Sequence, residues 1–233
     1  MNRLMYSIGL GPGDPDLVTV KASKILAQSN VIIVPQSDKT GRSVAKEIVS
    51  YYVNPDVITM YHFPMNNNKE ELNARYSKLA CHISDLIEDK KIVSFVTLGD
   101  PTIYSTSNYL TDSLKKLKVE IQHIPGISSI NAVSSRLGLP LCVKGENFAV
   151  YELPFHVDEA VQIIERHSSV VFLKVNKKLD CLMRAVQITA PAHAYMIRRI
   201  GLDGEELYNL LDSSPSSETA YLSVALIRRR LKT

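Results

Sequence analysis

The chain has 233 residues, 45% of them hydrophobic and 22% charged, which is typical of a globular protein with a packed core. The net charge of +3 is too small to indicate a nucleic-acid-binding protein, although it permits an acidic small-molecule substrate. Three scattered cysteines and six histidines lack metal-ligand spacing, so we expect neither disulfides nor a protein-held metal. No apolar run approaches a membrane span of about 20 residues, and no signal peptide is recognisable; we expect a cytoplasmic protein.

Short apolar runs alternate with helical patterns through the first half of the chain. Five runs are predicted to be strands: MYSIGL, NVIIVP, DVITMY, IVSFVTLGD and VEIQHIPG, which begin at residues 5, 30, 56, 92 and 119. The fourth run is almost continuously apolar, as expected for a central parallel strand that is covered on both faces. Residues 69–91 carry one apolar helical face, formed by Leu72, Tyr76, Leu79, Ile83 and Leu86. These patterns predict a mainly parallel sheet with crossover helices.

The second half begins with a predicted helix that ends at Gly138 and is followed by Pro140. Strands are predicted in NFAVYEL, SVVFLKV, AHAYMIRRI and AYLSVALI, and two amphipathic helices between them are expected to begin at the N-caps Asp158 and Asn176. The basic run RRRLK, which begins at Arg228, is interpreted as a terminal charge cluster rather than a nucleic-acid patch. We therefore expect two α/β domains, residues 1–125 and 126–233.

A glycine-rich loop, Gly9-Leu10-Gly11-Pro12-Gly13-Asp14, follows the first predicted strand. It differs from a dinucleotide fingerprint because Asp14 takes the place of the third glycine, and from a P-loop because no Gly-Lys-Ser/Thr follows. Pro12 favours a rigid loop, and the glycines allow close approach of the backbone. A tight turn that only connects a strand to a helix is the alternative interpretation.

A second loop, TLGDPTIYS, follows the most apolar strand at residues 97–105. Ligands of open parallel sheets bind beyond the carboxyl ends of the strands, and Gly99 removes side-chain bulk at this point. Asp100 places a carboxylate there without an evident partner nearby in the sequence. Alternatively, Asp100 caps the helix that follows.

The third loop, IPGISS, occupies residues 124–129, again between a strand and a helix. Ser128 and Ser129 suit helix N-caps. Free N–H groups and hydroxyls at such a helix start also suit a carboxylate or a ribose.

Together and in this order, GLGPGDPDLVT, TLGDPTIYS and IPGISS resemble the three signature regions of the tetrapyrrole methylases, which are class III S-adenosylmethionine-dependent methyltransferases. The resemblance covers essentially the whole chain. It implies an α/β fold of two α/β domains, the N-terminal one mainly parallel and the C-terminal one mixed, with a ligand cleft between them. It also implies a homodimer with S-adenosylmethionine as methyl donor. This donor has no phosphate, which explains why the glycine loop is not a phosphate cradle.

Within this family, the segment His62-Phe63-Pro64-Met65 and the TLGDPTIYST form of the second loop look like the branch that methylates carbon 20 of the corrin precursor. The small-molecule substrate would be precorrin-2, or cobalt-factor II when cobalt is already inside the ring. An apolar strand exit capped by proline is the alternative interpretation of that segment. Two other functions remain open: a methylase of the same fold with another acceptor atom, and a non-catalytic nucleotide-binding module.

The resemblance also assigns roles to individual residues. The cofactor-binding candidates are Pro12, Gly99, Asp100, Ile103, Tyr104, Ser128, Ser129, Val175, Ala220 and Tyr221. Asp100 is the catalytic candidate, because a carboxylate there would hydrogen-bond a pyrrole N–H and stabilise developing positive charge. The substrate-binding candidates are Gly11, Gly13, Arg42, His62, Arg75 and Arg198, with Lys144 and Arg199 as further cations for a carboxylate-rich substrate. Each cation could instead be a solvated surface charge, and no nucleic-acid or membrane partner is expected.

Overall fold

The computed structural model describes residues 3–36, 43–63, 69–216 and 222–229. The chain forms two compact units, Met1–Ser128 and Ser129–Thr233. The division expected from the sequence, after residue 125, falls just before this boundary. Within the described residues, no helix is both long and apolar enough to cross a membrane.

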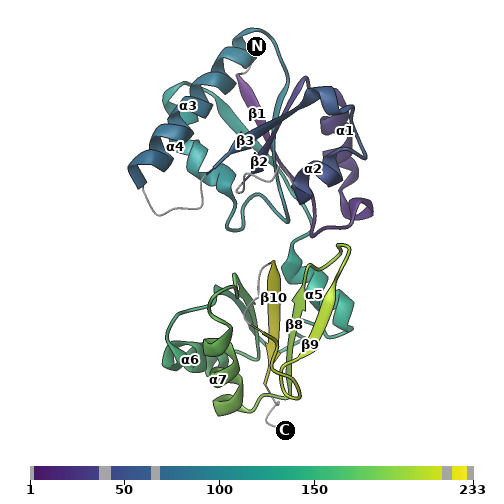
Figure 1. Cartoon of the computed structure of the whole chain (residues 1–233), viewed down its shortest axis with the longest axis vertical. Coiled ribbons are helices and arrows are strands. Elements are labelled where there is room, and N and C mark those ends of the chain that lie inside the picture. Colours follow the sequence, from purple (N-terminus) through teal and green to yellow (C-terminus); the bar gives the residue numbers. More distant parts are fainter. Residues whose placement is uncertain (1–2, 37–42, 64–68, 217–221, 230–233) are drawn as a thin grey trace. The chain divides into compact units, whose positions relative to one another are not determined.

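The first unit is built on a parallel sheet of five strands, as the sequence predicted (Figure 1). The strands are β1 (Leu4–Gly9), β2 (Val31–Gln36), β3 (Ile58–His62), β4 (Val93–Thr97) and β5 (Glu120–Ile124). Their order across the sheet is β3-β2-β4-β1-β5, and every neighbouring pair is parallel. β1 therefore lies between β4 and β5.

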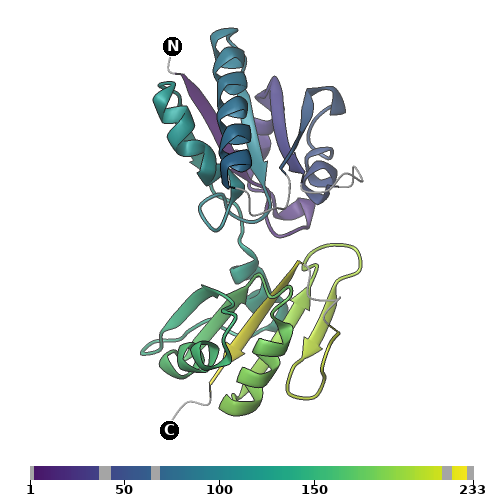
Figure 2. The same ribbon diagram turned by 60° about the vertical axis from the view of Figure 1, so that its left-hand side comes forward.

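Helices cover both faces of this sheet (Figures 1 and 2). They are α1 (Val20–Gln28) and α2 (Val44–Val49) on one face, and α3 (Lys69–Glu88) and α4 (Thr111–Lys116) on the other. The alternation of side chains along β2 explains the two layers. Ile33 packs with the α3 residues Leu79 and Ile83, whereas Ile32 and Val34 pack on the opposite face with the side chains of α1 and α2. All of these side chains are buried, so the sheet is apolar on both faces as parallel sheets require.

The second unit contains a mixed sheet, which confirms the expected fold class. Its strands are β6 (Phe148–Glu152), β7 (Ser169–Leu173), β8 (His193–Arg198), β9 (Glu206–Asn209) and β10 (Ser223–Arg228), in the order β6-β7-β10-β8-β9. Only β6 and β7 pair in parallel; the other neighbours are antiparallel. β9 is not evident in the sequence, because its four residues, ELYN, form no apolar run. Pairing with β8 makes them the edge strand of the sheet.

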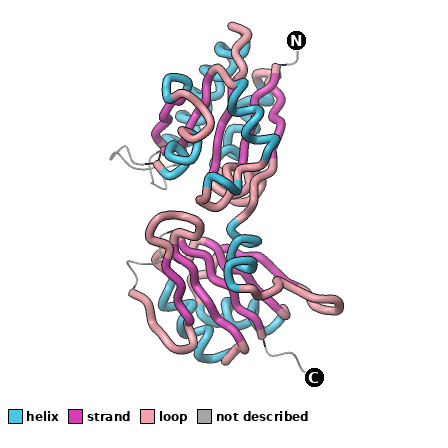
Figure 3. Tube along the Cα trace, turned by 90° about the vertical axis from the view of Figure 1, so that its right-hand side faces the viewer, coloured by secondary structure: helices cyan, strands magenta, loops and turns pink. Residues whose placement is uncertain are grey.

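Helices of the second unit lie on both faces of this sheet (Figure 3). They are α5 (Ser129–Leu137) and, opposite it, α6 (Val157–Arg166) and α7 (Leu179–Thr189). α5 ends just before Gly138, whose φ of +64° is a left-handed conformation that glycine adopts without strain, as the sequence predicted.

The two predicted N-caps of this unit are wrong. His156 is the N-cap of α6, and Lys178 is the N-cap of α7; neither makes a side-chain capping bond. Asp158 lies inside the first turn of α6, where its charge favours the helix N-terminus. Asn176 lies before α7, because the Lys178 N–H first closes a turn onto the carbonyl of Val175.

Arg228 is also not part of an exposed charge cluster. It is the last residue of β10 and is only 8% exposed. Its guanidinium bonds both carboxylate oxygens of Glu146, at 2.9 and 3.0 Å, and also donates to the carbonyl of Pro140. A bidentate pair with these partners satisfies a charge that would otherwise be costly to bury. Arg228 thus fastens the segment that follows α5 to the central strand.

Candidate functional site

The three glycine-containing loops of the first unit meet at one edge of the parallel sheet. They follow β1, β4 and β5, which are neighbours in the sheet. The ladder between β1 and β4 continues into the first two loops. The Leu10 N–H donates to the Thr97 carbonyl at 2.9 Å, and Gly11 and Gly99 exchange backbone hydrogen bonds of 3.3 and 2.7 Å. The sequence-predicted loops therefore come together at the carboxyl end of the sheet.

Three glycines cross at this edge, and two of them, Gly9 and Gly126, have no room for a side chain. A Cβ atom on Gly9 would lie 2.5 Å from the Gly99 carbonyl oxygen, and one on Gly126 would lie 2.8 Å from the Gly9 Cα atom. Gly99 differs: with a φ of +68°, its missing side chain would meet only the Ser128 Cα atom, at 4.0 Å. The backbone is thus closely packed where the Gly99 carbonyl meets Gly9 and Gly126, behind Gly99. It is open in front of Gly99, on the side to which a Gly99 Cβ atom would point.

Asp100 connects the second loop to the third. Its Oδ1 atom accepts hydrogen bonds from the backbone N–H of Thr102, at 2.9 Å, and from the Thr102 hydroxyl. Its Oδ2 atom accepts from the Gly126 N–H at 3.1 Å. The alternative role as a helix cap is not observed, because Ser105 caps the following 3-10 helix, Thr106–Leu110. The carboxylate therefore closes a turn and holds two loops together.

The remainder of the second loop rests on a chain of buried hydroxyl groups. Ser7 of β1 donates to Ser107 at 3.0 Å, and Ser107 is 2.9 Å from Ser105. All three side chains are buried. Above them, Tyr104 has a φ of +49° and a half-exposed ring, and Ile103 is partly buried. A non-glycine residue in this conformation is strained and is found most often at functional sites.

The first loop is buried, and hydrogen bonds hold the segment that follows it. Gly11, Pro12 and Gly13 are buried. The Asp14 carboxylate accepts from the backbone N–H of Asp16 at 2.9 Å. The Thr19 hydroxyl caps α1 at 3.2 Å and also lies 3.4 Å from the carbonyl of Pro125 in the third loop. Thr19 was not predicted to be a site residue, since a helix cap in the sequence gives no signal of a second, distant partner.

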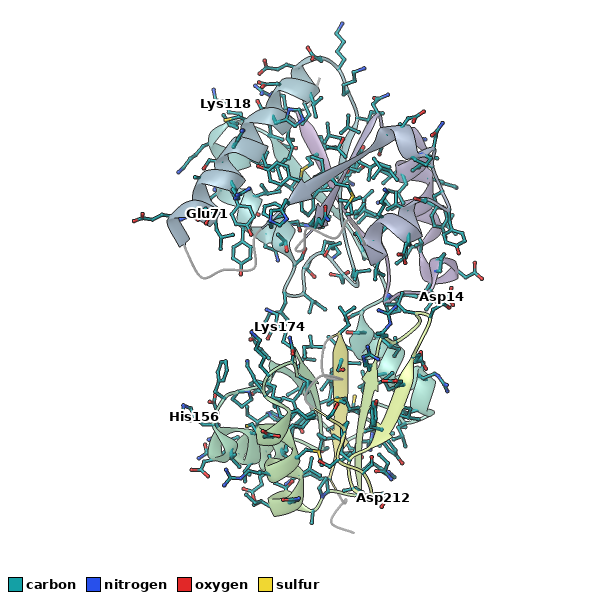
Figure 4. The ribbon with its side chains drawn as sticks, in the orientation of Figure 1. Asp14, Glu71, Lys118, His156, Lys174 and Asp212 are labelled. Carbon is teal, nitrogen blue, oxygen red and sulfur yellow. The ribbon has the colours of Figure 1, made fainter. Side chains whose placement is uncertain are left out.

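The substrate-binding candidates are distributed over both units. His62 ends β3 and is partly exposed, and Arg75 of α3 pairs with Glu71 at 3.1 Å (Figure 4 labels Glu71). Arg198 of β8 pairs with Glu206 at 3.0 Å. The other cations in the second unit are Arg199, which donates to the Asp203 carbonyl, and Lys144, which is exposed. Arg42, Pro64 and Met65 lie outside the described residues.

The cofactor-binding candidates of the second unit have different surroundings. The Val175 side chain is completely buried in the core of that unit, so only its backbone is available to a ligand. Ser129 is the first residue of α5, whereas Ser128 ends the first unit and is 7% exposed. Ala220 and Tyr221 lie outside the described residues.

A lysine pair borders Val175 at the ends of β6 and β7. The ammonium of Lys178, which is 8% exposed, donates to the Leu153 carbonyl at 2.6 Å and to Glu152 at 3.0 Å. Lys174, visible in Figure 4, bonds the same carboxylate at 3.4 Å. Burial acts to raise the pKa of Glu152, but hydrogen bonds and charges from the two lysines outweigh it and lower the pKa below the usual value.

The part of the chain that the structure describes holds no cluster of three or more His, Cys, Asp or Glu side chains that could bind a metal ion.

Comparisons with known proteins agree with the sequence motifs. Residues 5–213 match the model of the Tetrapyrrole (Corrin/Porphyrin) Methylases. The cobalt-precorrin-2 C(20)-methyltransferase of Salmonella typhimurium is 29% identical to this chain, over 99% of the chain and 98% of that protein. The probable cobalt-precorrin-2 C(20)-methyltransferase of Methanocaldococcus jannaschii is 31% identical, over 98% and 99%.

Two solved structures share the fold. A cobalt precorrin-4 methyltransferase superposes with a TM-score of 0.76 at 17% identity, covering 97% of this chain and 95% of that one. The uroporphyrin-III C-methyl transferase of Thermus thermophilus, complexed with S-adenosyl homocysteine, gives a TM-score of 0.63 at 19% identity, covering 96% of both chains.

Proposed function

Because the chain belongs to the tetrapyrrole (corrin/porphyrin) methylases, we propose that it transfers a methyl group from S-adenosylmethionine to carbon 20 of a reduced tetrapyrrole in cobalamin biosynthesis. The observation that carries the position of transfer is the similarity, over nearly the full length, to two proteins named for that carbon. The acceptor is cobalt-factor II or precorrin-2, a polycarboxylate that the mildly basic chain suits. Any cobalt enters as part of this substrate.

The sheet edge of the first unit fits a methyl donor of this kind. The space in front of Gly99 is open, and the backbone behind it is closed by Gly9 and Gly126. A ligand can therefore approach the main chain of the second loop closely. In our proposal the cofactor contacts from the first unit are Pro12, Gly99, Asp100, Ile103, Tyr104 and Ser128, and those from the second unit are Ser129, Val175, Ala220 and Tyr221.

Bound S-adenosylmethionine supplies an electrophilic methyl group on a sulfonium centre. The chain contributes position: hydrogen bonds from Thr102 and Gly126 hold the Asp100 carboxylate, and that carboxylate in turn holds the second loop against the third. A rigid loop orients the reacting groups without reorganisation at the moment of transfer. Asp100 therefore acts mainly as a positioning residue. A direct role in stabilising charge on the tetrapyrrole is the second candidate role for the same carboxylate.

The decisive experiment is a paired assay with cobalt-factor II and metal-free precorrin-2, each incubated anaerobically with the purified protein and S-adenosylmethionine. We expect the mass of one substrate to rise by one added methyl group. With ¹³C-methyl S-adenosylmethionine, NMR should place the label at carbon 20. A label at another carbon would reassign the protein within its family. If neither substrate gains mass, and calorimetry detects no binding of S-adenosylhomocysteine, the methyltransferase proposal is wrong.

We also propose that the protein works in the cytosol as a homodimer. The resemblance to the family implies the dimer, and the scattered, unpaired cysteines suit a reducing compartment.

A further inference from the structure

Four aromatic side chains of the first unit pack against one another in a continuous column. Tyr61 and Phe63 have ring centroids 5.0 Å apart, Phe63 and Tyr76 stack at 4.9 Å, and Tyr76 and Tyr109 stack at 5.4 Å with an angle of 27° between their planes. We call these four residues the aromatic column. It joins the end of β3, the first half of α3 and the 3-10 helix Thr106–Leu110. Phe63 belongs to the segment His62-Phe63-Pro64-Met65, whereas Tyr109 lies outside every motif described above.

The column lies at the same edge of the sheet as the glycine loops. Thr59 of β3 and Phe95 of β4 both pair with Ile33 of β2. Phe63 follows Thr59 by as many residues as Gly99 follows Phe95. Because parallel strands advance together, Phe63 and Gly99 mark the same carboxyl edge. The column therefore begins at the same edge of the sheet as the proposed cofactor loop, with β2 between β3 and β4.

The outermost ring of the column is exposed, although its neighbours are not. Tyr76 and Phe63 are each 7% exposed, whereas Tyr109 is 67% exposed. Tyr109 uses one ring face to stack on Tyr76, so the exposed area belongs to the rest of the ring. An aromatic surface of this size beside a catalytic loop is a common recognition element.

The backbone that carries Tyr109 is firmly anchored. Leu110, which follows it on the 3-10 helix, and Ser107, two residues before it, are completely buried. Ser107 accepts the hydrogen bond from Ser7 of β1, and Leu110 packs in the core with Phe63 and Tyr76. The exposed ring is therefore carried by a fixed backbone and supported by Tyr76. Less conformational entropy is then lost when a ligand binds to it.

We propose that Tyr109 is a specificity-determining residue that stacks against the macrocycle of the tetrapyrrole substrate. This inference rests on the proposed function. A planar conjugated ring matches the flat face of a tyrosine that is already supported from behind by Tyr76. Arg75, adjacent to Tyr76 in α3 and partly exposed, adds a cation on the same stretch of helix for a substrate rich in carboxylates. Tyr61 fixes that stretch, because its hydroxyl donates to the Arg75 carbonyl at 3.0 Å.

The test compares Tyr109→Leu, which removes the ring, with Tyr109→Phe, which retains it. Tyr51→Leu is the matched control, because Tyr51 is a 75% exposed tyrosine of the same unit that belongs to neither the column nor the loops. The dissociation constant of cobalt-factor II is measured by titration of its visible absorption, and that of S-adenosylhomocysteine by calorimetry. We expect Tyr109→Leu to weaken binding of the tetrapyrrole about tenfold, as expected for loss of one stacked aromatic pair and its contact area. Tyr109→Phe, Tyr51→Leu and all affinities for S-adenosylhomocysteine should stay near those of the parent protein.

Each other outcome overturns the inference in a different way. Equal affinity of Tyr109→Leu and Tyr51→Leu for the tetrapyrrole would show that the ring makes no substrate contact. A parallel loss of affinity for S-adenosylhomocysteine, or a lower midpoint of thermal unfolding, would show that Tyr109 supports the loop or the core instead. A loss in Tyr109→Phe as large as in Tyr109→Leu would assign the effect to the hydroxyl group rather than to stacking. Failure of the parent protein to bind either tetrapyrrole would reject the proposed function itself.

Discussion

Asp100 illustrates at the scale of a single residue how one carboxylate can position a site. Both of its oxygens are used within the first unit, one by Thr102 and one by Gly126. An asparagine can accept at only one of these places, and its amide nitrogen would face a donor at the other. The surroundings of residue 100 thus favour a carboxylate over its closest isostere, the asparagine amide.

We therefore predict that Asp100→Asn lowers kcat/KM about 10- to 100-fold, the equivalent of one lost hydrogen bond to a charged group. If Asp100 acts by positioning, the loss should appear largely as weaker binding of S-adenosylhomocysteine in calorimetry. Thr102→Val, which removes only the hydroxyl donor, should show a smaller loss of the same kind. A large fall in kcat for Asp100→Asn, with unchanged affinity for S-adenosylhomocysteine, would instead support direct stabilisation of charge on the substrate.

The partners of Asp100 show what the sequence could and could not reveal. Thr102 follows Asp100 by two residues, and an aspartate that accepts from the residue two positions later is a known turn pattern. The bond between Asp100 and Thr102 could therefore be predicted from the sequence. The bond between Asp100 and Gly126 could not be predicted, because only the order of the strands in the sheet brings the Gly126 N–H to Asp100. The three loops could be recognised as motifs, but their mutual contacts could not be predicted.

At the scale of the elements, the crossing of Gly9, Gly99 and Gly126 sets how closely three strand ends can approach. A methyl group on Gly126 would overlap the backbone of the other two glycines, and no side-chain rotation can relieve that overlap. The strand ends would have to separate, and the second loop would move with them. The crossing is therefore a requirement of the fold and of the site at once.

We predict that Gly126→Ala destabilises the protein by about 2–3 kcal/mol, as overpacking does, and lowers methyl transfer more than tenfold. Gly138→Ala is the control: it replaces a glycine with a φ of +64° but meets nothing within 4 Å. It should cost only about 1 kcal/mol, from its backbone conformation, and leave activity unchanged. Thermal unfolding and the assay of methyl transfer measure both effects. A Gly126→Ala variant as stable and active as Gly138→Ala would contradict the close packing of the crossing.

Element by element, the success of sequence prediction followed the strength of the apolar pattern. β4 and β10 are buried along almost their whole length and were evident as apolar runs. β9 is a short edge strand without such a run, so only its pairing with β8 defines it. The helix starts were misplaced because Asp158 and Asn176 are good caps in isolation, whereas the turn at Lys178 decides where α7 begins. Arg228 was misread because its partner, Glu146, is distant in the sequence.

At the scale of the whole molecule, the proposed homodimer can be measured directly. The two edge strands of the second sheet, β6 and β9, carry the exposed apolar side chains Phe148 (43%) and Leu207 (47%). Exposed sheet edges with apolar side chains are commonly covered by another chain. We predict that light scattering gives twice the 26.0 kDa mass of the chain at micromolar concentration. A mass of one chain at every concentration tested would refute the dimer.

The position of β10 in its sheet has a consequence for how the chain is made. β10 joins β7 to β8, yet it is encoded after every other described strand. During synthesis the ribosome releases all five strands of the first unit before β10 exists, so that unit can fold while the second sheet still lacks its middle strand. In that interval the facing edges of β7 and β8 present unpaired backbone groups to solvent, a state in which nascent chains are prone to aggregate. Completion of the second sheet by β10 thus ends the interval in which the second unit is prone to misassembly.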